Sequence, residues 1–286
     1  MRLGDGLLPL SIRPSILAPP LDREICPRFP SLGLQRNFDY AMTKRMSLER
    51  RIRRAIGRFY MATLRRLMPV QSHVRYNGVI VEDRRFLDDK LPRYWKPSRC
   101  RDMPDYEDAL VEGLSQVLRA GDKVVVVGGG LGVTVAVAAR IVGDQGSVVC
   151  FEGAPDFARS TWKTAARNDL SRRVDVKCAI VGADVGVYQT ENSASSEIFP
   201  PESLPDCDVL ELDCEGAEIL VIENMRVKPR AILVETHGML GAPSAAVQAA
   251  LEGRGYDVTT IGIAEPSLTE YCESNDVRVL CGIARR

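Results

Sequence analysis

From residue 105 onward the chain alternates between short apolar runs and longer segments with an apolar residue at every third or fourth position. The short runs, such as VVVV at 124–127 and AILV at 231–234, contain no polar alternation. This pattern is typical of strands that are covered on both faces. The longer segments have the period of amphipathic helices. The alternation predicts an α/β domain with a doubly wound, mostly parallel sheet.

The predicted elements occupy defined ranges, and no internal repeat interrupts their order. We predict helices at residues 106–119, 131–142, 155–168, 216–225 and 243–254. We predict strands at residues 123–127, 147–151, 173–178, 208–213, 230–236, 256–262 and 277–284. Residues 106–286 are therefore expected to form one domain.

The first hundred residues do not share this pattern. Residues 1–45 contain six prolines and no sustained hydrophobic period, which predicts a disordered tail. Residues 46–105 are predicted to form an extension with a helix and a hairpin. From Ser47 onward, apolar side chains recur at helical spacing among arginines, which predicts a basic amphipathic helix. The later segment RYNGVIVEDRRF predicts a strand or hairpin around an Asn-Gly turn.

Charge is divided unevenly along the chain. Residues 1–105 carry 22 Lys and Arg against 11 acids, and residues 106–286 carry the remaining 16 and 27. The two regions could dock on each other, or the basic helix could make weak contact with an anionic membrane surface. No apolar run is long enough to cross a bilayer, and the N-terminus lacks a signal-peptide pattern. Eight cysteines scattered without metal-binding spacing fit a reducing compartment, so we expect a cytoplasmic location.

A glycine-rich loop follows the predicted strand 123–127, in the run VVVVGGGLGVTV. Gly128, Gly130 and Gly132 would let the chain turn sharply and let a ligand approach main-chain atoms. Ligands of doubly wound sheets bind at this place, beyond the carboxyl ends of the strands. The dinucleotide fingerprint G-x-G-x-x-G would need a glycine where Val133 stands. A simple tight turn without a ligand is the alternative.

The next strand ends in Glu152, which follows Gly128 by 24 residues. A carboxylate at this place can accept hydrogen bonds from both hydroxyls of an adenosine ribose. NAD and S-adenosyl-L-methionine are the two candidate cofactors. A hydride-transfer enzyme of the short-chain type would carry Tyr-x-x-x-Lys downstream of the loop, but the only such spacing is Tyr40 and Lys44, upstream of it. We therefore expect S-adenosyl-L-methionine as the cofactor.

Several downstream segments resemble the FkbM family of S-adenosylmethionine-dependent methyltransferases. In order, they are VVVVGGGLGVT, VVCFEG, AIVG, VLELDCEGAEILVIENM, ILVETHG and LEGRGYDV. The run LDCEGAE is the most specific, and the resemblance extends over about residues 106–262. It implies a class I methyltransferase (Rossmann-like) fold, with seven strands of which the last is antiparallel. It also implies methyl transfer to a hydroxyl oxygen, on a small molecule or a glycan.

The resemblance also bears on the cofactor contacts. It adds Ala179, at the start of AIVG, to the contacts expected from the glycines and Glu152. Family members commonly carry an acid two residues before the first glycine, and this chain has Val126 there. Contacts to the amino end of the methyl donor would have to come from elsewhere.

The candidate catalytic residues lie at two neighbouring strand ends. Asp213 ends the predicted strand 208–213, and Glu235 and His237 lie at the end of the strand 230–236. Transfer to an alcohol needs a base that removes its proton. We predict His237 as this base, with Asp213 positioning the donor or the acceptor and Glu235 on the same side. A structural hydrogen bond is the alternative role for His237.

Three further hypotheses remain open. Glu215 and Glu218 could cap the predicted helix at 216–225. We assign no metal ligands, although Asp213, Glu235 and His237 are chemically suited to a divalent ion. RNA methylation and a non-catalytic nucleoside-binding module are the alternative functions. Nucleic acid is not expected, because FPP at 199–201 precedes the strand 208–213, whose end carries DCEG instead of the Pro-Pro run of base-methylating enzymes.

Overall fold

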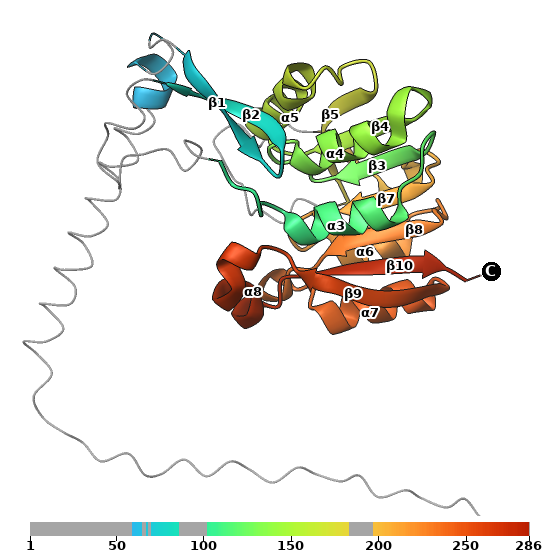
Figure 1. The fold of residues 1–286 in the computed structure, drawn as a ribbon. Helices are drawn as coiled ribbons and strands as arrows, with labels where there is room; N and C mark the ends of the chain where they lie inside the picture. The colour runs from blue at the N-terminus through green and yellow to red at the C-terminus, as the bar shows by residue number, and fades with distance from the viewer. Residues whose placement is uncertain (1–58, 65–66, 68–69, 86–101, 183–196, 286) are drawn as a thin grey trace, which may run out of the picture. The chain divides into compact units, whose positions relative to one another are not determined.

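The computed structural model describes residues 59–64, 67, 70–85, 102–182 and 197–285 of the chain (Figure 1). Its main sheet has eight strands in the order β6-β5-β4-β3-β7-β8-β10-β9. The strands are β3 (Lys123–Val127), β4 (Ser147–Glu152), β5 (Val174–Val181), β6 (Glu197–Phe199), β7 (Val209–Leu212), β8 (Ala231–Glu235), β9 (Tyr256–Ile263) and β10 (Arg278–Ala284).

Neighbouring strands of this sheet are parallel except around β10, which is antiparallel to both β8 and β9. The predicted doubly wound, mostly parallel fold is confirmed, including its antiparallel last strand. The sheet has one strand more than the seven that the resemblance implied, because β6 adds a short edge strand beside β5. With three residues, β6 is too short to produce a hydrophobic period.

Helices cover both faces of the sheet. They are α3 (Asp108–Val117), α4 (Val133–Val142), α5 (Pro155–Arg167), α6 (Glu218–Asn224), α7 (Ser244–Gly253) and α8 (Thr269–Asn275). Short 3-10 turns are η2 (Gly143–Gln145), η4 (Pro201–Ser203), η5 (Gly238–Leu240) and η6 (Pro266–Leu268). Side chains of α3 and α4 join the core of one face, and those of α6 and α7 join the core of the other. All five predicted helices are present, whereas α8 was not predicted.

Strand β3, which comes first in the chain among the strands of this sheet, shows why such strands lack polar alternation. Val124 and Val126 belong to the core on the side of α3 and α4, while Val125 and Val127 belong to the core on the side of α6 and α7. None of the four is more than 3% exposed. Burial of each such side chain contributes about 1.5–3 kcal/mol, so both faces of β3 must be apolar.

The predicted Asn-Gly hairpin is present. Strands β1 (Val70–Tyr76) and β2 (Val79–Arg85) pair antiparallel around Asn77 and Gly78. Both turn residues have positive φ, 44° and 75°, as a two-residue type I′ turn requires. Asn168, at the end of α5, donates to the Ile80 carbonyl at 2.8 Å and accepts from its N–H at 3.2 Å. These two bonds fix the hairpin to the main sheet's helical layer.

Some predictions fall outside the described residues. The tail 1–45 and most of the basic helix from Ser47 are among them, and of that helix only its end is described, as a short π-helix, η1 (Tyr60–Leu64). The domain boundaries and the membrane contact therefore stay predictions. Among the described residues, no helix has the length and apolar character needed to cross a membrane. Of the cysteines in this part of the chain, Cys178 is exposed and Cys150 is buried.

A partly buried ion pair joins the amino ends of the central strands. Arg230 binds both carboxylate oxygens of Asp122, at 2.9 and 2.6 Å, and also the Val117 carbonyl at 2.7 Å. Burial alone would raise the pKa of Asp122, but the bonds from Arg230 and from the Arg119 N–H lower it. An Arg230→Met variant removes the guanidinium and leaves the Asp122 carboxylate with the bond from the Arg119 N–H. We expect the free energy of unfolding to fall by about 1–3 kcal/mol. Each kcal/mol lost should lower the Tm by about 2–4 °C.

Thermal unfolding at several pH values measures this effect. A carboxylate with a lowered folded pKa contributes stability above its unfolded pKa and loses it as pH falls through the folded value. The difference in stability between the variant and the parent should therefore become smaller in strong acid. Arg285→Met is the matched control, because its pair with Asp257 is solvent-exposed and such pairs contribute only about 0–1 kcal/mol. Equal losses from the two variants would contradict the prediction.

Candidate functional site

A cavity of about 420 Å³ opens at the carboxyl ends of the central strands. Its walls include Gly128 and Gly130 after β3, Glu152 at the end of β4, Asp213 after β7 and His237 after β8. The chain order reverses here, since β4 and β7 lie on opposite sides of β3. This is the switch point at which doubly wound sheets bind their ligands.

The three predicted glycines have different roles. A Cβ on Gly128 would lie 1.8 Å from the carbonyl oxygen of Asp213, and one on Gly132 would lie 2.8 Å from the Cα of Thr161. A Cβ on Gly130 would meet no atom nearer than Glu107 Oε1, at 3.9 Å. Gly128 and Gly132 therefore let the loop pack closely, whereas Gly130 leaves main chain open to the cavity. Gly132 is not among the residues that line it.

Glu152 lies where the sequence predicted it. Its side chain is held by two backbone groups: Oε2 accepts from the Gly130 N–H at 2.8 Å, and Oε1 accepts from the Ala154 N–H at 2.7 Å. Burial raises the pKa of Glu152, and these N–H bonds oppose the rise. The carboxylate lines the cavity, and its remaining lone pairs can accept hydrogen bonds from a ligand. The predicted contact Ala179 also lines the cavity, across from the loop on β5.

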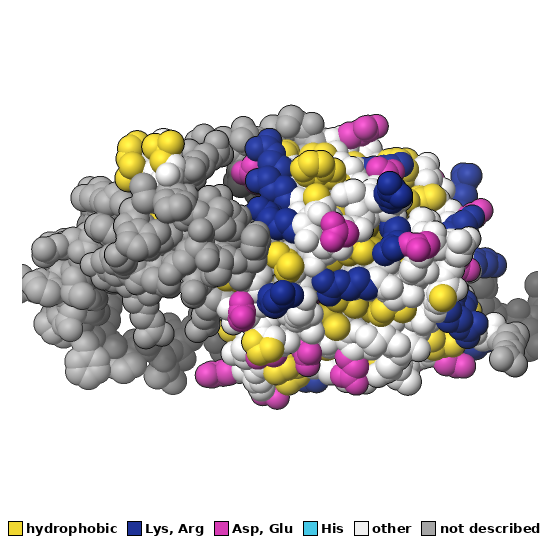
Figure 2. Space-filling model, turned by 45° about the horizontal axis from the view of Figure 1, so that its top comes forward, with side chains coloured by type: hydrophobic (Ala, Val, Ile, Leu, Met, Phe, Trp, Pro, Cys, Tyr) yellow, Lys and Arg dark blue, Asp and Glu magenta, His cyan; other side chains and the backbone are white. Residues whose placement is uncertain are grey.

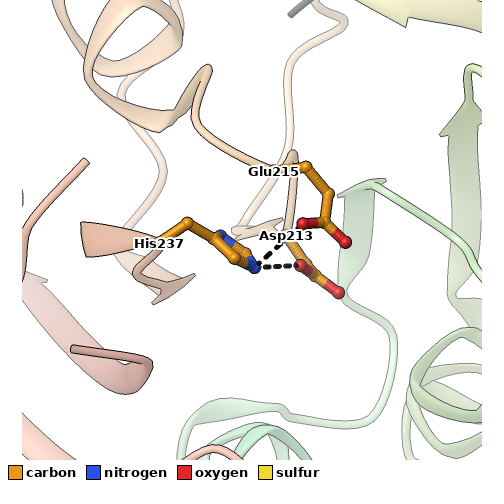
Figure 3. Close-up of side chains that lie close together, drawn as sticks. All are labelled: Asp213, Glu215 and His237. Carbon is orange, nitrogen blue, oxygen red and sulfur yellow. Dashed lines mark ion pairs between the residues drawn. The ribbon is translucent and has the colours of Figure 1, made fainter. Parts of the chain in front are cut away.

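Four acidic side chains surround His237. Its Nδ1 lies 2.8 Å from Glu218 Oε1. Its Nε2 lies 3.6 Å from Asp213 Oδ1, 3.5 Å from Glu215 Oε2 and 3.7 Å from Glu235 Oε1. Figure 3 shows this nitrogen directed toward Asp213 and Glu215. The structure thus brings together the three predicted catalytic residues and adds Glu215 and Glu218 to them.

The electrostatics of this group bear on the predicted base. Burial by itself lowers the pKa of His237, but the bond to Glu218 and the charges of Asp213 and Glu215 outweigh it and raise the pKa to about 9. Burial raises the pKa of Asp213 to about 7, although the charge of His237 opposes the rise. A base must accept a proton near the working pH. Between these two residues, Asp213 is the better matched to that role.

Glu218 begins α6, which has no side-chain cap hydrogen bond, and it bonds the preceding backbone and a partner that the sequence did not signal. Its Oε1 accepts from the N–H groups of Cys214 and Gly216, at 3.3 and 3.1 Å, just before α6. The same atom bonds His237, and the side chain is 0% exposed. A carboxylate at the start of this helix was visible in the sequence. The bond to His237 was not, because it joins segments that meet only when β7 and β8 pair.

Two further acids of the cavity, Glu107 and Glu265, were missed. Glu107 was predicted inside a helix, but it precedes α3 with φ of 52°, and it lines the cavity. Burial, together with the charges of Asp213 and Glu211, raises its pKa well above the ordinary value. Glu265 lies just before η6 and also lines the cavity. The sequence placed Glu107 within a helix and Glu265 outside every predicted element, so no pattern indicated that either lines the cavity.

Glu211 is an acid inside the core, next to the site. It lies on β7 opposite Val126 of β3 and is 0% exposed. Burial raises its pKa to about 8, although a bond from the Thr134 side chain opposes the rise, and this favours the neutral acid at pH 7. The acid that the resemblance placed at position 126 is absent there, and the neighbouring strand carries one at the same level.

The charge of the cavity is one-sided. Among the described residues, no lysine or arginine lines it, and His237 is its only basic side chain. Its acidic side chains are Glu107, Glu152, Asp213, Glu215, Glu235 and Glu265. Figure 2 shows lysine and arginine side chains on the outer surface instead, mixed with acidic and apolar ones. Such a cavity favours a cationic ligand and disfavours phosphate groups.

Comparison with known protein families gives one match. Residues 103–190, less than a third of the chain, match the family described as protein-L-isoaspartate(D-aspartate) O-methyltransferase. The matched segment contains the glycine loop and Glu152. A comparison with curated protein sequences gave no significant match.

Solved structures with a similar fold are distant in sequence. An S-adenosylmethionine-dependent O-methyltransferase from Thermotoga maritima is 16% identical, with a TM-score of 0.41 over 63% of this chain and 65% of the other. The O-methyltransferase TomG from Streptomyces achromogenes, in complex with S-adenosylmethionine, is 16% identical, with a TM-score of 0.40 over 70% of this chain and 87% of the other. Fibrillarin from Aeropyrum pernix, with natively bound S-adenosyl-L-methionine, is 14% identical, with a TM-score of 0.40 over 61% and 76%. Likenesses at this level do not extend to substrate.

Proposed function

We propose that the chain is an S-adenosyl-L-methionine-dependent methyltransferase that methylates a hydroxyl oxygen. The observation that carries the proposal is the cavity at the switch point, with six carboxyl side chains and neither lysine nor arginine among its described lining residues. S-adenosylmethionine brings a positive sulfonium and an ammonium group into such a cavity. NAD brings two phosphate charges, which the carboxyl side chains of this cavity would repel.

The adenosine end of the donor has a suitable cradle. Gly130 leaves main chain open at the cavity wall, and Glu152 is fixed beside it by the 2.8 Å bond from the Gly130 N–H. The remaining lone pairs of Glu152 can accept the two ribose hydroxyls. Ala179 lines the cavity from β5 and offers a small apolar contact for the adenine ring.

The amino end of the donor has a different partner from the one that the resemblance suggested. Position 126 carries valine, fully buried in the core. Glu107 supplies a carboxyl group instead, since its Oε1 lies 3.9 Å from the position of a Cβ on Gly130. An ammonium group beside Glu107 would stabilise the charged carboxylate, whose pKa burial otherwise raises.

The chemistry depends on position and on a proton acceptor. S-adenosylmethionine supplies an electrophilic methyl group on its positive sulfur. Alignment of such a group with an acceptor oxygen can supply about 7–11 kcal/mol of the rate acceleration. Asp213 is suited to accept the hydroxyl proton, because its pKa is about 7. In the chain without a bound cation, His237 has a pKa of about 9, so that its Nε2 can carry a proton and donate a hydrogen bond to the same acceptor.

The proposed family and the proposed class of methyl acceptor rest on the sequence. The ordered segments around LDCEGAE support placing the chain with the FkbM methyltransferases, and with them a small-molecule or glycan hydroxyl as acceptor. The family match to an O-methyltransferase over residues 103–190 supports oxygen as the methylated atom. We infer that RNA is not the acceptor, because phosphates would enter a cavity lined by acids.

Calorimetry with S-adenosylmethionine and with NAD tests the proposed donor. The full-length chain should bind S-adenosylmethionine and not NAD. Glu152→Ala should weaken donor binding about 10- to 100-fold, because a hydrogen bond to a charged group contributes about 1.5–3 kcal/mol. Glu223→Gln, an exposed acid of α6, should have no effect. Tighter binding of NAD would overturn the proposal.

A further inference from the structure

We propose that Asp213, Glu215 and His237 bind a divalent metal ion at the carboxyl ends of β7 and β8. The three residues offer two carboxylate oxygens and one imidazole nitrogen, and these atoms all lie within 4.8 Å of one another. They come from the two loops that follow adjacent parallel strands, and in Figure 3 their polar ends converge. The set differs from the one considered in the sequence, because Glu215 takes the place of Glu235.

The spacing of the atoms fits a shared ion better than direct pairing. Nε2 of His237 lies 3.6 Å from Asp213 Oδ1 and 3.5 Å from Glu215 Oε2. A charge-assisted hydrogen bond would be about 2.7–2.9 Å long. Two ligands at about 2.0–2.2 Å from one tetrahedral ion lie about 3.4 Å apart. The two observed separations are close to the second value.

Asp213 gives a second and independent indication. Its Oδ1 is buried and has no hydrogen-bond partner among the described residues, a costly state for a carboxylate oxygen. His237 is 4% exposed, and its Nε2 lies 3.6 Å from this atom. No lysine or arginine is among the described residues that line the cavity around Asp213. A divalent cation would satisfy both atoms at once.

Glu218 prepares the imidazole for this role. Its buried Oε1 lies 2.8 Å from His237 Nδ1, so it can accept a proton held there. That leaves the lone pair of Nε2 facing Asp213 and Glu215. Histidines that ligate metals commonly have such a carboxylate on their other nitrogen, which fixes the ring and its tautomer. Glu218 is therefore a positioning residue, not a ligand.

The chemistry of the three ligand atoms favours some metal ions over others. One imidazole with two carboxylates suits Mn²⁺ or Zn²⁺ better than Mg²⁺, which prefers oxygen ligands alone. Three protein ligands leave positions open for an acceptor hydroxyl, whose pKa a bound cation would lower. The site stands on the geometry of these residues, independently of the identity of the methyl donor.

Titration of the metal-free full-length chain with Mn²⁺ tests the site. Electron paramagnetic resonance of free Mn²⁺ and calorimetry should both give one ion per chain. Glu215→Gln and His237→Gln should weaken binding at least about 10-fold, and Glu218→Gln should also weaken it about 10-fold through the imidazole. Glu270→Gln, an exposed acid of α8, is the matched control and should bind like the parent. Circular dichroism verifies that each variant folds, and Zn²⁺ and Mg²⁺ serve as competing ions.

Each outcome decides the proposal. Loss of binding in folded Glu215→Gln and His237→Gln, with retention in Glu270→Gln, supports the site. Absence of stoichiometric Mn²⁺ and Zn²⁺ binding by the parent, or equal binding by all variants, overturns it. Calorimetry of the same proteins with S-adenosylmethionine separates the two proposals. Metal binding without donor binding would refute the proposed function alone, and donor binding without metal binding would refute the metal site alone.

Discussion

A Gly128→Ala variant is expected to lose most of its stability, and with it donor binding. The added Cβ would lie 1.8 Å from the carbonyl oxygen of Asp213, at a residue whose φ is +95°. The backbone cannot move aside cheaply, because the Gly128 N–H bonds the Phe151 carbonyl and the Asp213 N–H bonds the Val127 carbonyl, both at 2.8 Å. Overpacking and a strained φ each cost about 1–3 kcal/mol. We expect a total loss of about 2–6 kcal/mol in urea unfolding.

Gly255→Ala is the matched control for this variant. Gly255 has a similar φ of +88°, but a Cβ there would meet no atom within 4 Å. It therefore carries the backbone strain without the clash, and should lose only about 1–3 kcal/mol. The difference between the two variants isolates the close approach of β3 to the residue after β7. If the two lose equal stability, close packing at Gly128 is not what requires glycine.

The parts of the fold that could be predicted are those with a hydrophobic period. Strand β3 is a valine run buried on both faces, and its position was predicted without error at either end. Helix α8, with the sequence TEYCESN, has Cys272 as its one buried residue, so it has no apolar stripe to detect. The edge strand β6 is short and has two exposed residues out of three. Both elements owe their conformation to neighbours and not to their own pattern.

The site was predictable where its residues follow strands. Glu152 and Asp213 come directly at the ends of β4 and β7, and parallel strands bring such positions to one edge. Glu107 could not be predicted, because its carboxyl group reaches the cavity only through a positive φ of 52° before α3. The role of Gly132 was also different from the one expected, since its place is set by the backbone of Thr161 on α5. Contacts between segments that are far apart in the chain produce no hydrophobic periodicity, so the sequence pattern does not predict them.

An Asp213→Asn variant is expected to lower kcat about 10²- to 10⁴-fold, the usual contribution of a positioned base. Asparagine keeps the shape of the side chain but cannot accept the hydroxyl proton. Donor affinity should change little, because the adenosine contacts come from Gly130 and Glu152. Steady-state transfer from labelled S-adenosylmethionine to the best hydroxyl acceptor found in a screen of sugars and phenols measures kcat, and calorimetry measures donor affinity.

Glu152→Gln serves as the control. In contrast to Asp213→Asn, it should weaken donor binding and change kcat less than Asp213→Asn does. Asp213 is also a ligand of the proposed metal site, so kcat falls whichever role it has. Excess Mn²⁺ separates the two roles. If Asp213 acts only as a ligand, high Mn²⁺ restores much of the rate of Asp213→Asn, because Glu215 and His237 still hold the ion. If Asp213 accepts the proton, the rate stays low at every Mn²⁺ concentration. A kcat within a few-fold of the parent would mean that the carboxylate has neither role.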